Sequence, residues 1–190
     1  MRSCPAINTA IVDYMTQRGA FLVNYIGHAA VQRWAGEQIF KNADVPLISN
    51  SDRLSVVLSM TCLDGYWIHP QQDSLVSELL RDADSGVVAT LSPNGLGVST
   101  GHDVLHRGFY RAIIEDGVND LGAATLAGKL ALYEDHYHGS YNDDTSVYYH
   151  YDNYFTYDLV NTFSIFGDPA LKFQYPLPSL SLPLISNTFP

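Results

Sequence analysis

The sequence predicts an α/β fold built around a mainly parallel sheet. Three runs of apolar and β-branched residues have the length and composition of buried strands, at residues 21–26, 54–60 and 86–91. Segments with the length and pattern of helices separate these runs along the chain. Strands that alternate with helices indicate a parallel sheet, because each parallel connection has to cross over the sheet.

Composition limits the classes of function. With 190 residues, 46% of them hydrophobic, the chain has the size of one domain with a substantial core. Its formal net charge of −10 argues against nucleic acid as a partner, because contacts to phosphates need clustered Lys and Arg. No apolar stretch reaches the roughly 18 residues of a membrane span, and the first residues lack the apolar core of a signal peptide. Cys4 and Cys62 are too few for a disulfide framework and are interpreted as free thiols.

The first half of the chain is predicted to hold a helix before the first strand, a loop with a short helical turn, and a helix after the second strand. These segments are residues 7–17, 29–50 with the turn at 37–40, and 74–81. Gly19 ends the first helix, and Asp73 or Ser74 caps the last one.

The second half is predicted to hold two long helices, a polar tyrosine-rich loop, a further helix and a last short strand. They occupy residues 102–115, 121–133, 134–153, 154–162 and 171–173, with a turn at 166–169. We expect a single domain over residues 1–175. The repeated Pro, Leu and Ser of residues 176–190 indicate an extended linker or the start of a following domain.

Two strands of the predicted sheet lead into residues whose side chains commonly take part in catalysis. The first leads into His28 and the second into Cys62. The carboxyl ends of parallel strands share one edge of a sheet, where ligands usually bind. A Cys–His nucleophilic pair is therefore one interpretation. The alternatives are an inert core cysteine and a histidine that is hydrogen-bonded to a loop.

Only one helix precedes the first strand, although that strand already carries a candidate catalytic residue. A sheet of this kind usually continues with further strands on its other side. We therefore expect the chain to represent a partial domain whose first strands lie upstream.

An ordered series of motifs resembles the gingipain-type cysteine peptidases of the caspase-like clan. The series runs across residues 20–173 and comprises Asn24-Tyr25-Ile26-Gly27-His28, Trp34, Ser49-Asn50, Val56-Val57-Leu58-Ser59-Met60-Thr61-Cys62, Ser74-Leu75 with Glu78, Gly86-Val87-Val88-Ala89, Ser92-Pro93-Asn94, Leu121-Gly122, Ala127-Gly128-Lys129 and Phe166-Gly167-Asp168-Pro169-Ala170-Leu171. Each motif is weak alone, and their common order carries the resemblance.

The resemblance implies a caspase-like three-layer α/β/α sandwich and endopeptidase activity on polypeptide substrates without a required cofactor. It implies that Cys62 is the nucleophile that forms a thioester, and that His28 acts as general base or acid. The backbone N–H groups of Ala29 and Cys62 would form the oxyanion hole. An extracellular or cell-surface location is also implied, whereas the oligomeric state stays open.

Ala29 departs from the family pattern, in which a glycine usually follows the histidine. Alanine keeps the backbone N–H, but strains the chain by about 1 kcal/mol if the position needs a positive φ. The alternative function is therefore a catalytically inactive caspase-like domain that binds or scaffolds other molecules.

Three residues near the same sheet edge are candidates for substrate binding. Ser92 and Asn94 follow the third strand, and the alternative for them is a plain turn. Asp103 lies where such enzymes build the pocket for the residue before the cut, and an acid there would favour Arg or Lys. Its alternative role is that of an acid in the first turn of a helix. Asp64 is interpreted as a turn former before Gly65.

An acidic and histidine-rich stretch raises the question of a metal. It contains Glu134, Asp135, His136, His138, Asp143, Asp144, His150 and Asp152. Oxygen-rich loops bind Ca²⁺, and a Ca²⁺-dependent adhesion module is a third functional hypothesis. The spacing matches no closed ligand pattern, so we expect no metal ligands in the site itself, with Ca²⁺ as an optional ion.

Overall fold

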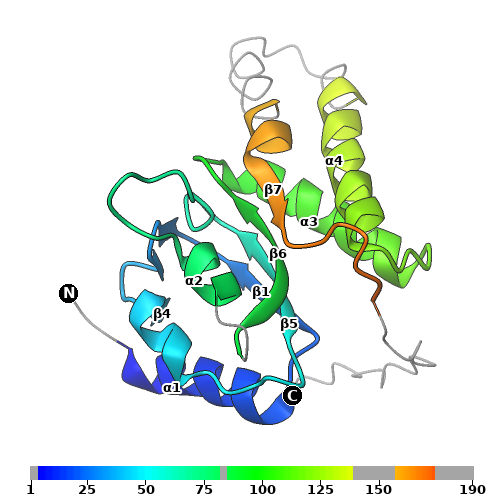
Figure 1. The fold of residues 1–190 in the computed structure, drawn as a ribbon. Helices are drawn as coiled ribbons and strands as arrows, with labels where there is room; N and C mark the ends of the chain where they lie inside the picture. The colour runs from blue at the N-terminus through cyan, green and yellow to red at the C-terminus, as the bar shows by residue number, and fades with distance from the viewer. Residues whose placement is uncertain (1–3, 82–84, 139–156, 174–190) are drawn as a thin grey trace, which may run out of the picture.

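The computed structural model describes residues 4–81, 85–138 and 157–173. Its centre is a four-stranded sheet in the order β1 (Leu22–Ile26), β5 (Ser55–Met60), β6 (Val87–Pro93) and β7 (Phe163–Phe166). The first three strands are parallel and β7 runs antiparallel to β6. The mainly parallel sheet and the three predicted strands are confirmed (Figure 1).

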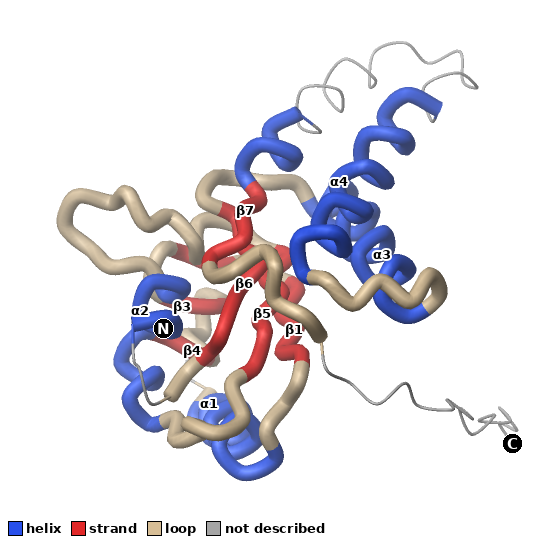
Figure 2. The backbone as a smooth tube through the Cα atoms, turned by 45° about the vertical axis from the view of Figure 1, so that its right-hand side comes forward, coloured by secondary structure: helices blue, strands red, loops and turns tan. Residues whose placement is uncertain are grey.

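Helices cover both faces of this sheet, which gives the three predicted layers (Figures 1 and 2). One face carries α1 (Pro5–Asp13), which continues as a π-helical turn over Tyr14–Arg18, and α2 (Leu75–Arg81). The other face carries α3 (Ser99–Ile114) and α4 (Leu121–His138). Gly19, with φ of 64°, ends the first helix as predicted.

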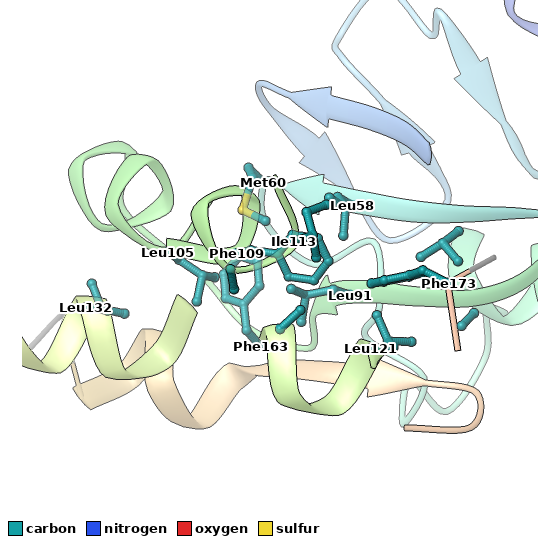
Figure 3. Close-up of a cluster of buried hydrophobic side chains, with 14 of the residues drawn as sticks. Leu58, Met60, Leu91, Leu105, Phe109, Ile113, Leu121, Leu132, Phe163 and Phe173 are labelled. Carbon is teal, nitrogen blue, oxygen red and sulfur yellow. The ribbon is translucent and has the colours of Figure 1, made fainter. Parts of the chain in front are cut away.

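The central strand β5 supplies side chains to both layers because neighbouring residues of a strand point to opposite faces. Val56, Leu58 and Met60 belong to a core shared with α3 and α4, and Figure 3 shows Leu58 and Met60 there beside Phe109. Val57 belongs to the second core, on the side of α1 and α2. All six residues of β5 are buried, and four of them are apolar.

Two glycines allow α3 and α4 to pack closely. A Cβ on Gly108 would lie 2.6 Å from the Ala131 Cβ and 2.9 Å from the Gly128 Cα. A Cβ on Gly128 would lie 2.7 Å from the Leu105 carbonyl oxygen. The two helices therefore meet backbone to backbone at this point.

The segment after β1 differs from the predicted loop. It forms a small antiparallel sheet of β2 (Ala29–Ala30), β3 (Arg33–Trp34) and β4 (Phe40–Lys41), followed by a 3-10 helix, η2, over Asn42–Leu47. The helical turn predicted at residues 37–40 is wrong, because positive φ values of 58° at Ala35 and 55° at Gln38 form a turn between strands. Strands of two residues are too short to show an alternating pattern.

The last strand also differs from the prediction. Residues 157–162 are helical as expected, but the strand that follows is β7, not residues 171–173. The latter segment makes a single bridge between Lys172 and Asp120. One polar residue, Ser164, interrupts the apolar run of this four-residue strand and obscures it in the sequence.

The tryptophans have different environments. Trp34 is buried in the second core, as a packing residue should be. Trp67, which a large apolar ring would lead one to expect in a core, is 62% exposed, so the expectation that both tryptophans are packing residues is wrong for Trp67. Within the described ranges, no helix combines the length and the apolar character needed to cross a membrane.

Candidate active site

The register of β1 on β5 sets the positions of His28 and Cys62. Ile26 pairs with Met60, and the Gly27 N–H donates to the Met60 carbonyl at 3.3 Å. His28 lies two residues after Ile26, and Cys62 lies two residues after Met60. The two strands are adjacent and so lie about 4.8 Å apart. Both residues therefore leave the sheet at the same edge, as the sequence predicted.

Cys62 begins a tight and strained turn. The Asp64 N–H donates to the Cys62 carbonyl at 2.8 Å, and Leu63 between them has a φ of 63°. A hydrogen bond between residues i and i+2, with a positive φ at the residue between them, defines a rare and strained γ-turn. Backbone strain of this kind persists where the surrounding structure fixes the conformation. The Leu63 N–H donates to Gly95 O at 3.0 Å, which ties the turn to the loop after β6.

The Cys62 thiol is a free, half-buried group in this turn. Its sulfur lies 3.6 Å from the Gly97 carbonyl oxygen, to which the thiol donates. Cys4 is also free, so neither cysteine forms a disulfide. A half-buried thiol at a sheet edge is open to a reaction partner, whereas a cysteine in the middle of a core is not.

His28 has an exposed side chain on a fixed backbone. Its carbonyl oxygen accepts from the Ala35 N–H at 2.8 Å and from the Tyr25 hydroxyl at 2.6 Å. The two bonds hold the turn between β1 and β2, so the backbone from which the exposed imidazole extends is fixed. The next residue, Ala29, begins β2, which is the position proposed for an oxyanion-hole donor.

Asp64 has a larger role than its interpretation as a turn former allows. Its side chain is fully buried, and Oδ2 accepts a hydrogen bond from Trp34 Nε1 at 2.9 Å. Burial raises the pKa of Asp64 to about 7, although the Ser59 hydroxyl and the Trp34 indole both lower it. The sequence offers one signal for this residue, an acid shortly after the end of a buried strand.

His102 lies in the first turn of α3, next to the loop that receives the Cys62 thiol. The side chain is 6% exposed and its ring packs against Phe163 at 5.3 Å between centroids. Burial lowers the pKa of His102 to about 4, so the imidazole is neutral at physiological pH. Its neighbour Asp103 is exposed and forms an ion pair with Arg107 at 3.0 Å.

Ser92 lies within β6 and not after it as predicted, and Asn94 directly follows that strand. Ser92 is fully buried and pairs with Ser164 in the sheet. The Asn94 side chain donates to Ser164 Oγ at 3.2 Å, and its backbone N–H donates to Thr162 O at 2.9 Å. These contacts have a structural use, so a role of Ser92, Asn94 or Asp103 in substrate binding stays a prediction.

The metal question concerns mainly residues 139–156, which lie outside the described residues. Among residues that the structure does describe, no three His, Cys, Asp or Glu side chains gather as a metal site. Glu134 and Asp135 are exposed on α4. Binding of Ca²⁺ by this stretch stays a prediction.

Comparisons with known structures agree with the fold. The structure is similar to that of the Arg-specific cysteine proteinase gingipain R (RgpB), with a TM-score of 0.74 and 21% identity over 90% of this chain and 37% of that chain. A complex of the Porphyromonas gingivalis RgpB pro- and mature domains gives a TM-score of 0.74 and 20% identity, over 90% of this chain and 38% of the other. A third structure, described only as a protease, gives a TM-score of 0.67 and 15% identity, over 84% of this chain and 37% of the other.

The chain thus spans little more than a third of the length of these solved structures. No curated protein matches it. The sequence model of peptidase family C25, in contrast, matches residues 1–174, which is most of the chain. We conclude that this chain belongs to peptidase family C25, the gingipain family of cysteine peptidases.

Proposed function

We propose that the chain carries the catalytic pair of a cysteine endopeptidase, with Cys62 as the nucleophile and His28 as the general base and acid. The observation that carries the proposal is the register of β1 on β5, which brings both residues to one sheet edge from adjacent strands. The strained turn after Cys62 supports it, because backbone strain concentrates at active sites.

In the proposed reaction, the Cys62 sulfur attacks the carbonyl carbon of the scissile peptide bond. The thiol proton passes to His28, which then protonates the amine as the C–N bond breaks and leaves a thioester. A water molecule next attacks the thioester carbonyl and gives a proton to His28. The thioester bond breaks, and that proton returns to the Cys62 sulfur.

The negative charge on the carbonyl oxygen needs donors during both attacks. The backbone N–H groups of Ala29 and Cys62 are the proposed oxyanion hole, and each such donor typically lowers the barrier by about 3 kcal/mol. Alanine supplies this N–H as well as glycine does. The reaction uses only side chains and backbone groups of the protein. Its proposed substrates are polypeptides, and its proposed location is the cell surface or the space outside the cell.

Peptide-based acyloxymethyl ketone probes test the proposal on the full-length protein. Three probes carry Arg, Lys or Ala next to the reactive group, since the similar RgpB structure is that of an Arg-specific enzyme. Labelling should disappear in Cys62→Ala, slow strongly in His28→Ala and persist in Cys4→Ala. A folded protein that takes up none of the probes would contradict the peptidase function and favour a binding or scaffolding role.

A further inference from the structure

We propose that Asp64 is a positioning residue that links the Cys62 turn to the His28 turn through the side chain of Trp34. The inference rests on the proposed function, because it concerns the relative placement of the same two residues. Asp64 does not touch the substrate in this proposal. It acts through Trp34 alone.

The first half of the link fixes Asp64 to the nucleophile. The Asp64 N–H donates to the Cys62 carbonyl at 2.8 Å, and the Asp64 carbonyl accepts from the Val76 N–H of α2 at 3.0 Å. Asp64 is therefore held between the Cys62 turn and a helix of the core. Its side chain is fully buried, so Oδ2 is a fixed acceptor for Trp34 Nε1.

The second half runs from Trp34 to His28 by three contacts. Trp34 pairs with Ala29, the residue after His28, in the small antiparallel sheet. The indole stacks on Tyr25, with ring centroids 4.6 Å apart, and the Tyr25 hydroxyl donates to the His28 carbonyl at 2.6 Å. Ala35, next to Trp34, donates its N–H to the same carbonyl at 2.8 Å. A shift of the indole therefore moves the backbone from which the imidazole extends.

The choice of an acid at this buried place supports a functional role. Asp64 Oδ2 is bonded to Trp34 at 2.9 Å, and the Ser59 hydroxyl also favours the charged carboxylate. Burial outweighs these bonds and raises the pKa of Asp64, so packing alone does not favour an acid here. Active sites commonly retain such groups because they fix geometry.

The charges around Asp64 are few. Burial raises the pKa of Tyr25, which stacks on Trp34, and the negative charges of Asp64 and Glu37 raise it further. Burial raises the pKa of Asp64 itself to about 7. Asp64 and Tyr25 are thus the titratable groups in contact with Trp34 that a pH profile has to separate.

Alkylation of Cys62 by iodoacetamide tests the link, with rates measured from pH 5 to pH 9 on the full-length protein. Asp64→Ala removes the acceptor, Trp34→Phe removes the donor but keeps a ring, and Asp64→Asn keeps an acceptor without the charge. We expect Asp64→Ala and Trp34→Phe each to slow alkylation by about tenfold or more, since small displacements of catalytic groups have large effects. The double variant should be no slower than either single one, and Asp64→Asn should stay within about threefold of the parent.

Asp44 offers a matched control. It is also a buried aspartate, 8% exposed, and its carboxylate accepts from the Lys41 N–H at 2.9 Å. Asp44→Ala should leave the alkylation rate and its pH profile unchanged as long as the protein is folded. A loss of rate there equal to that of Asp64→Ala would overturn the proposal, because it would indicate a general effect of lost stability.

The same variants in a His28→Ala background separate the possible failures. A positioning effect through His28 predicts that Asp64→Ala and Trp34→Phe cause no further slowing there. Equal slowing with and without His28 would overturn the link. If His28→Ala alone leaves the rate unchanged, the Cys–His pair of the proposed function is wrong. If Asp64→Ala does not fold, Trp34→Phe decides, since it removes the N–H and retains an aromatic side chain in the core.

Discussion

Asp64 makes the stability of the folded chain depend on pH. Its pKa is raised by burial from 3.8 to about 7, so the folded chain retains a proton that the unfolded chain releases between these values. Stability therefore falls as the pH rises from about 4 to about 7, and it levels off above that range. The difference corresponds to at most about 4 kcal/mol, at about 1.4 kcal/mol for each pKa unit.

The variant Asp64→Asn should remove this dependence, because an amide is neutral at every pH in the window. Urea unfolding at pH 8 should show the variant to be more stable than the parent by several kcal/mol, and at pH 4 the two should agree closely. An equal difference at both pH values would contradict the ionised buried state of Asp64.

Asn50 is a second buried polar residue whose use is clear from its partners. Its Oδ1 accepts from the Gly86 N–H at 2.8 Å and its Nδ2 donates to the Gly86 carbonyl at 2.9 Å. Asn50→Ala would leave both backbone groups unpaired at the start of β6. We expect a loss of about 2–4 kcal/mol in the free energy of unfolding, measured in urea. Asn119→Ala, at an exposed position, should lose less than about 0.5 kcal/mol.

The sequence indicated His28 and Cys62 because each follows an apolar strand. It did not indicate the bond between Trp34 and Asp64, which joins residues 30 positions apart. Such a contact depends on how the small sheet of β2, β3 and β4 packs against the turn after β5. The local pattern of apolar and polar residues carries no information about that packing. A residue's partner is a property of the tertiary structure.

At the scale of single elements, the contact between α3 and α4 depends on the absence of side chains at its centre. A Cβ at residue 128 would meet the backbone of α3, 2.7 Å from Leu105 O and 3.3 Å from Phe109 N. Gly128→Ala should therefore separate the helices and reduce the free energy of unfolding by about 1–3 kcal/mol. Gly36→Ala is the control, since nothing lies within 4 Å of its Cβ position, and it should change stability little. Thermal unfolding of both variants would compare them.

Elements were predictable where their pattern was long enough. The strand β5 has six buried residues and was evident in the sequence. The helix α4 was predicted over residues 121–133 but continues to His138, so the assignment of residues 134–138 to a loop was wrong. The strands β2, β3 and β4 have two residues each, so neither alternation nor length identifies them. The strand β7 follows directly on a helix without a turn residue between them, which left its boundary without a signal.

At the scale of the whole molecule, β5 joins two cores that lie on opposite faces of the sheet. Leu58 contributes to the core with α3 and α4, and Val57 to the core with α1 and α2. Because the strand is shared, both cores should unfold in a single transition.

Leu58→Ala and Val57→Ala test this expectation from the two sides. Each should lower the free energy of unfolding by about 2–5 kcal/mol, since both residues are fully buried. Tryptophan fluorescence and circular dichroism should report coincident transitions in both variants. If one variant unfolded in two separate steps, the two halves would be independent units.

The α/β class followed from the alternation of strands and helices, the three layers were implied by the resemblance to gingipain-type peptidases, and the structure confirms both. The pairing of β7 antiparallel to β6 did not follow, because direction depends on the path of the connecting chain. The sequence thus predicted the strands that position His28 and Cys62 better than the small sheet and turns around them.

The pairing of Ile26 with Met60 also has a consequence for how this chain can change in evolution. One residue inserted into β1 or β5 would shift His28 or Cys62 by about 3.3 Å and turn its side chain to the opposite face. An insertion in the connection between α3 and α4 would leave both strands unchanged. Among homologues, we expect gaps in an alignment to collect in such connections, while the lengths of β1 and β5 stay constant.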